Sequence, residues 1–119
     1  MNLNDLVGMQ VVMDESHGFP INFKNTADKY QQLTRDLVGL FGEVGEFSNI
    51  VKKININLAR PKDYPVNLSE AEDKLKMELI DSLIYIIRIG AILKIDLEAE
   101  LLKTIKKNEV RYEKLRPSQ

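Results

Sequence analysis

"LTRDLVGLFGEVGEFSNIVKKI", residues 33–54, repeats its apolar side chains at the period of an α-helix. The apolar positions are spaced four and three residues apart without a miss, and a stripe with this spacing is typical of a helix that packs along its whole length. The stripe consists of Leu33, Leu37, Leu40, Val44, Phe47, Val51 and Ile54. We therefore expect a long amphipathic helix over about residues 27–54.

The same periodicity predicts three further helices, over about residues 4–15, 69–94 and 97–115. The helix at 69–94 is apolar around most of its circumference, which is typical of a central rather than a peripheral helix. Two helices joined by a moderate loop normally pack antiparallel. We expect one all-α domain, residues 1–119, forming a bundle of about four to five helices with two long central antiparallel helices.

Local signals place the ends of these helices. Ser69 followed by Glu72 matches a capping box at the start of the third helix. Asp96 is a good N-cap for the fourth helix. Two prolines interrupt residues 55–67, so we expect this segment to be a loop of a dozen or so residues.

Composition narrows the classes of function. The 119 residues include 44% apolar and 29% charged side chains with a formal net charge of −1, as in an ordinary globular domain. The balance of charge disfavours nucleic acid and acidic membranes as partners. There is no cysteine, which excludes disulfides and thiolate metal sites. The longest apolar run is far too short to span a bilayer, and the N-terminus lacks signal-peptide features, so we expect a cytoplasmic protein.

Two acidic pairs occur at one spacing, Glu43 with Glu46 and Glu78 with Asp81. Residues three apart on a helix lie on the same face, so each pair projects two carboxylates together. If the two long helices pack antiparallel, all four carboxylates meet, and their repulsion calls for protons or a cation. Oxygen ligands without His or Cys suit Mg²⁺ or Mn²⁺.

A simpler interpretation competes with the metal site. Lys74, Asp81 and Arg88 fall on the same side of the third helix as Glu78. These charged residues would then form a solvent-facing strip, as on many exposed helix faces.

Three glycines interrupt the second helix, and each costs roughly 0.8–1 kcal/mol relative to alanine in a helix interior. Gly39 falls on the face of the acidic pair, where we expect it to leave room for a phosphate or a metal ion. Gly42 and Gly45 lie further round the helix, where we expect them to permit a close helix crossing.

Three segments resemble one protein family: "LVGLFGEVGEFSNIVKK" (37–53), "KMELIDSLIYII" (76–87) and "IDLEAELLKTIKKNEVRYEKLRP" (95–117). Together they resemble the MazG-like nucleoside triphosphate pyrophosphohydrolases. This all-α group includes dCTPases, dimeric dUTPases and phosphoribosyl-ATP pyrophosphohydrolases. The resemblance covers roughly residues 33–117.

The resemblance implies a Mg²⁺-dependent enzyme that cleaves nucleoside triphosphates between the α and β phosphates, giving a monophosphate and pyrophosphate. The metal ligands carried over by match are Glu43, Glu46, Glu78 and Asp81. Many members have a further Glu where this chain has Gly42, which leaves open the group that orients the attacking water. We expect Glu43 or Glu46 to activate the water.

The resemblance also implies contacts with the nucleotide, from Lys53, Tyr85, Lys107, Asn108 and Arg111. Tyr85 and the tail residues have alternatives: Tyr85 as a boundary residue with its ring in the core, and the basic tail as a solvated helix end favoured by the helix dipole. The base pocket is expected to be lined by the first helix and the long loop.

The resemblance further implies a homodimer or homotetramer, which agrees with the excess apolar surface of the third helix. Two other functions stay open. One is a non-enzymatic helical dimerisation or adaptor module whose acids form a solvated strip. The other is a phosphoribosyl-ATP pyrophosphohydrolase, over which the K-N-x-x-R-Y tail favours the MazG-like branch.

Overall fold

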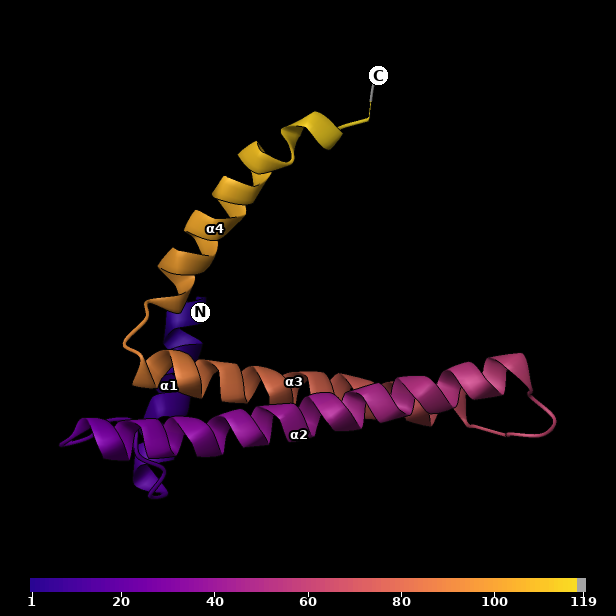
Figure 1. Ribbon diagram of the computed structural model, residues 1–119, viewed down its shortest axis with the longest axis horizontal. Coiled ribbons are helices and arrows are strands. Elements are labelled where there is room, and N and C mark those ends of the chain that lie inside the picture. The colour runs from indigo at the N-terminus through magenta and orange to yellow at the C-terminus, as the bar shows by residue number, and fades with distance from the viewer. Residues whose placement is uncertain (118–119) are drawn as a thin grey trace.

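Two long helices lie side by side as an antiparallel hairpin and form the body of the molecule (Figure 1). The computed structural model describes residues 1–117. Its helices are α1 (Leu3–Ser16), α2 (Thr26–Ala59), α3 (Leu68–Ile92) and α4 (Leu97–Arg111), followed by a 3₁₀ turn, η1 (Glu113–Leu115). The described part contains no strand, so the prediction of an all-α fold with two long central helices is confirmed.

The two short helices attach at one end of the hairpin. Figure 1 shows α1 crossing this end and α4 leaving it at a steep angle. The start of α1 is joined to the start of α4 by side-chain hydrogen bonds. Asn4 donates to Asp96 at 3.1 Å, and the backbone N–H of Leu3 donates to Glu98 at 3.2 Å. The opposite end of the hairpin, with residues 60–67, lies away from both α1 and α4.

Each α-helix begins at a capping side chain that accepts a hydrogen bond from a backbone N–H three residues on. Asp96 caps α4 as predicted, bonding Ala99 at 3.1 Å. The predicted capping box at Ser69 is wrong. Asn67 is the N-cap of α3 and accepts from the Glu70 N–H at 3.1 Å, because asparagine is also a preferred cap and lies earlier in the chain.

Helix α2 is longer than predicted and the loop after it is shorter. The helix continues to Ala59, and only residues 60–67 link it to α3. The ring of Pro61 disfavours helical geometry at the residue before it, Arg60, and leaves residues 55–59 free to stay helical. The link is held by a hydrogen bond from the Asn57 side chain to the Tyr64 carbonyl at 2.8 Å.

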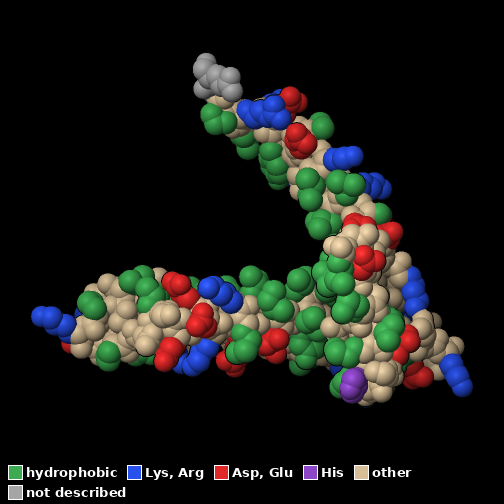
Figure 2. Space-filling view, turned by 180° about the vertical axis from the view of Figure 1, so that it is seen from behind, with side chains coloured by type: hydrophobic (Ala, Val, Ile, Leu, Met, Phe, Trp, Pro, Cys, Tyr) green, Lys and Arg blue, Asp and Glu red, His purple; other side chains and the backbone are tan. Residues whose placement is uncertain are grey.

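The interior of a single chain is small. Its buried residues within 1–117 are Gly90, four apolar ones (Ile21, Ala71, Ile87 and Ile92) and five polar or charged ones (Asp14, Gln32, Asp36, Ser82 and Arg88). Much of the apolar surface of α3 stays open, since Leu79, Ile80, Leu83 and Ile86 are between 43% and 58% exposed. Figure 2 shows hydrophobic side chains on both walls of the angle between α4 and the hairpin. The helix predicted to be central is therefore covered by α2 and, at one end, by α1, and much of its remaining surface is open.

None of the helices within residues 1–117 is both long and apolar enough to cross a bilayer.

Candidate functional site

Three of the four predicted acidic side chains meet between α2 and α3. Glu43, Glu78 and Asp81 each present a carboxylate oxygen, and the three oxygens lie within 4.8 Å of one another. The antiparallel hairpin causes this convergence, because it places the i,i+3 pair of α3 opposite Glu43. Glu46, one turn further along α2, is exposed and lies outside the three-way group.

Within residues 1–117, the negative charge of the three carboxylates is not balanced by positive side chains around them. The pKa of Glu78 is raised from 4.5 to about 7, first by the hydrogen bond that its protonated form shares with Glu43, then by burial and by the charges of Glu43, Asp81 and Glu46. Glu78 Oε2 is enclosed and has no hydrogen-bond partner within the described chain. An enclosed oxygen without a donor, among three converging carboxylates, fits a hard divalent cation.

The raised pKa of Glu78 makes stability depend on pH in a defined direction. Between pH 4.5 and about 7 the folded state holds a proton that the unfolded state releases, so folding is favoured at the acid end of this interval. We expect the metal-free protein to lose stability as the pH rises through this interval and then to level off. Urea unfolding at several pH values in EDTA measures this loss. Glu78→Gln should flatten the dependence, and an unchanged slope in that variant would contradict the assignment.

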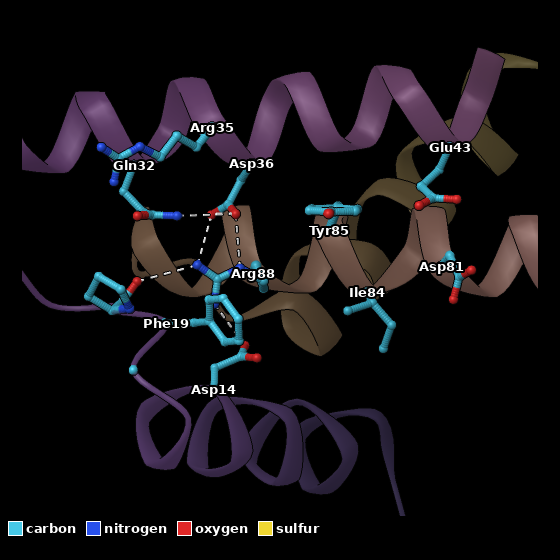
Figure 3. Close-up of a pocket in the computed structure, with 12 residues that line it drawn as sticks. Asp14, Phe19, Gln32, Arg35, Asp36, Glu43, Asp81, Ile84, Tyr85 and Arg88 are labelled. Atoms are coloured by element: carbon cyan, nitrogen blue, oxygen red, sulfur yellow. Dashed lines mark hydrogen bonds and ion pairs between the residues drawn. The ribbon is translucent and has the colours of Figure 1, made fainter. Parts of the chain in front are cut away.

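A cavity of about 900 Å³ extends from the carboxylates toward the end of the hairpin that carries α1 (Figure 3). It is lined by the end of α1, the segment after it and the facing sides of α2 and α3: Asp14, Gly18, Phe19, Pro20, Gln32, Arg35, Asp36, Glu43, Asp81, Ile84, Tyr85 and Arg88. The segment 60–67 does not line this cavity and lies at the other end of the hairpin. The expected contribution of the first helix is met by Asp14 alone.

Arg88 of α3 holds three parts of the chain together at the inner end of the cavity. Its guanidinium donates two hydrogen bonds of 3.0 Å to Asp36 of α2 and lies 2.9 Å from a carboxylate oxygen of Asp14 of α1. It also donates to the Pro20 carbonyl at 3.4 Å and lies 5.9 Å from the centre of the Phe19 ring. The predicted solvent-facing strip is therefore wrong for Arg88, which is only 5% exposed.

The sequence pattern does not predict this network. Asp36 lies one residue before the apolar stripe position Leu37 and has the pattern of an exposed charge. The available signal was that Gln32 and Asp36, four residues apart, continue the side of α2 that faces α3. Asp14 offered no comparable signal, because its partner Arg88 is distant in the sequence.

Tyr85 lies between the Arg88 network and the carboxylates and packs against Gly39 (Figure 3). A Cβ atom at Gly39 would lie 2.4 Å from the tyrosine ring. The expectation that Gly39 leaves room for a phosphate or a metal ion is wrong, because Tyr85 fills that space. A Cβ atom at Gly42 or Gly45 would meet no atom of another element within 4 Å in the described chain, so these two glycines do not mediate a helix crossing within it.

Alanine substitutions at these three glycines should have different effects on stability. Gly39→Ala forces the Tyr85 ring away and should lower the free energy of unfolding by about 1–3 kcal/mol, the usual effect of overpacking. Gly42→Ala and Gly45→Ala add a methyl group in open space and should each raise it by up to about 1 kcal/mol through helix propensity. Urea denaturation of the three variants measures these changes. A loss of stability in Gly42→Ala equal to that in Gly39→Ala would contradict the steric argument.

The remaining predicted contact residues lie apart from the carboxylates in a single chain. Lys53 is on α2 about 15 Å beyond Glu43 and lines a separate small cavity near the start of α3. Lys107, Asn108 and Arg111 are exposed on α4, which points away from the hairpin. Only Tyr85 of the predicted nucleotide contacts lies in the same cavity as the acids.

Comparison of the chain with protein-family models, with curated proteins and with solved structures found no match.

Proposed function

We propose that this protein is a Mg²⁺-dependent nucleoside triphosphate pyrophosphohydrolase that releases a nucleoside monophosphate and pyrophosphate. The observation that carries the proposal is the convergence of Glu43, Glu78 and Asp81 at one end of a cavity large enough for a nucleotide. The resemblance of the acidic helices and the basic tail to MazG-like enzymes supports the same activity. Mn²⁺ is an alternative ion, because it accepts the same oxygen ligands.

Different residues of the chain would bind the cation, accept the proton and contact the nucleoside. Glu43, Glu78 and Asp81 would hold the cation, which supplies charge neutralisation and polarisation at phosphorus when bound. Glu46 lies one turn from Glu43 on α2 and outside this group, so it would not be engaged by the cation and would accept a proton from the attacking water. Tyr85 lines the path from the acids into the cavity and would contact the nucleoside.

We also propose that the active form is a homodimer or homotetramer. Exposed apolar residues on two helices support this, because monomeric domains rarely leave so much apolar surface uncovered. They include Leu79, Ile80, Leu83 and Ile86 of α3 and Leu101, Leu102 and Ile105 of α4. A second copy would also offer a route for Lys107, Asn108 and Arg111 to reach a triphosphate, since in one chain they lie far from the acids. A monodisperse monomer in sedimentation velocity would refute this part.

The test is a panel of canonical and modified nucleoside triphosphates with Mg²⁺, including phosphoribosyl-ATP. Pyrophosphate, orthophosphate and the nucleotide product are scored separately. We expect pyrophosphate with a monophosphate. Orthophosphate with a diphosphate would refute α–β cleavage, and turnover of phosphoribosyl-ATP alone would favour the histidine-synthesis branch. No turnover, with no effect of Mg²⁺ on the melting temperature, would favour the adaptor module.

A further inference from the structure

The cavity differs in charge between its two ends. The outer end has the uncompensated carboxylates Glu43 and Asp81. At the inner end, the two arginines Arg35 and Arg88 balance the two aspartates Asp14 and Asp36. The outer end therefore suits a cation with phosphates, and the inner end suits a neutral polar group.

The distance between the two ends agrees with a nucleotide. Gln32 and Glu43 lie on the same helix eleven positions apart, which corresponds to about 16 Å along the axis. The Asp36–Arg88 pair and then Tyr85, which offers an aromatic surface, lie between Gln32 and Glu43 (Figure 3). A nucleotide with its phosphates at the carboxylates would lie along Tyr85 and extend its base past the Asp36–Arg88 pair toward Gln32.

The Gln32 side chain is held in one orientation. Asp36 is paired with Arg88, and an ionised carboxylate only accepts hydrogen bonds. The group of Gln32 that faces Asp36 must therefore be the amide NH₂, and Nε2 donates to Asp36 at 3.4 Å. Rotating the amide would set its oxygen against the carboxylate. Gln32 Oε1 has no hydrogen bond within residues 1–117, so it is an oriented acceptor on a side chain that lines the cavity.

We propose that Gln32 Oε1 selects nucleobases with an exocyclic amino group, adenine or cytosine, over bases with a keto oxygen in the same position. The inference rests on the proposed nucleotide hydrolysis and names the substrate class of that site. An amino group donates to Oε1, whereas a keto oxygen would face it with lone pairs and leave both groups unpaired. Arg88 acts through Asp36 as a positioning residue.

The experiment compares kcat/KM for two matched pairs, ATP with ITP and CTP with UTP. The wild-type protein should favour the amino member of at least one pair by about ten- to a hundredfold, the usual effect of a buried polar group left unpaired. Gln32→Met has a similar length but no acceptor, so it should bring that ratio close to one. Gln31→Met, on the exposed neighbouring residue, is the control and should keep the wild-type ratio.

Two outcomes would overturn the proposal: ratios near one or reversed for both pairs in the wild type, or a ratio that survives in Gln32→Met. If no triphosphate is hydrolysed, the proposed function fails, and the cavity is then tested separately. Equilibrium binding of the α,β-methylene analogues of the same four nucleotides replaces kcat/KM. A Gln32-dependent amino preference in binding would support the inference, and its absence would refute it.

Discussion

Arg88→Met is expected to lower the free energy of unfolding by about 3–5 kcal/mol, the usual loss when one partner of a buried ion pair is removed. The substitution leaves Asp14 and Asp36 facing each other at about 4% exposure each with no cation between them. It also releases the segment at Pro20 and the Phe19 ring from the cavity wall. Urea denaturation at pH 7 and a fixed protein concentration measures the loss.

The control for this substitution is Arg60→Met. Arg60 pairs with Asp63 at 3.9 Å, but both side chains are about three-quarters exposed, so the change should stay below about 1 kcal/mol. Replacing Arg88, Asp14 and Asp36 together by apolar residues of similar size should recover much of the loss, because no buried charge then remains. Equal losses in Arg88→Met and Arg60→Met would show that the network does not hold the helices together.

If the protein is the proposed Mg²⁺-dependent hydrolase, Glu78→Gln should reduce hydrolysis on the order of a thousandfold and abolish the rise in melting temperature expected on adding Mg²⁺. The amide keeps the size of the side chain but removes the charge at the centre of the acidic cluster, and the loss of a bound metal forfeits several kcal/mol of transition-state stabilisation. In EDTA the same variant should be more stable than wild type at neutral pH, since the hydrogen bond with Glu43, burial and the neighbouring charges raise the pKa of Glu78 and so disfavour its ionised form in the fold. Thermal melts with and without Mg²⁺, alongside pyrophosphate release, measure both effects.

Two further carboxylate variants distinguish loss of Mg²⁺ binding from loss of hydrolysis. Glu46→Gln should remove hydrolysis and keep the Mg²⁺ effect on melting, because Glu46 lies outside the three-way group. Glu72→Gln, on an exposed residue of α3, should change neither. A Glu78→Gln protein that is still stabilised by Mg²⁺ would rule out the cluster as the metal site.

The helical architecture could be predicted from the sequence because it follows from local pattern. The stripe from Leu33 to Ile54 sets the period and face of α2, and Asp96 marks the start of α4. Helix ends were harder to place, since Asn67 and Ser69 are both acceptable caps and sequence alone does not choose between them.

Part of the candidate site could likewise be predicted from local sequence pattern, and part could not. The meeting of Glu43, Glu78 and Asp81 was predictable, because it needs only i,i+3 spacing on two antiparallel helices. The Asp14–Arg88–Asp36 network and the packing of Tyr85 on Gly39 depend on how α1, α2 and α3 are placed in three dimensions. No periodicity encodes such contacts between distant residues.

The one-ended attachment of α1 and α4 has a consequence for how the hairpin opens. The contacts that these two helices add to the α2–α3 packing lie at the end that holds Arg88, so the far end is free to fray first. Backbone amides near Asp36 should exchange with deuterium most slowly, and those approaching Ala59 fastest. The connection at residues 60–67 is thereby the natural place for insertions, tags or a change of loop length, since it lies remote from both the carboxylates and the cavity.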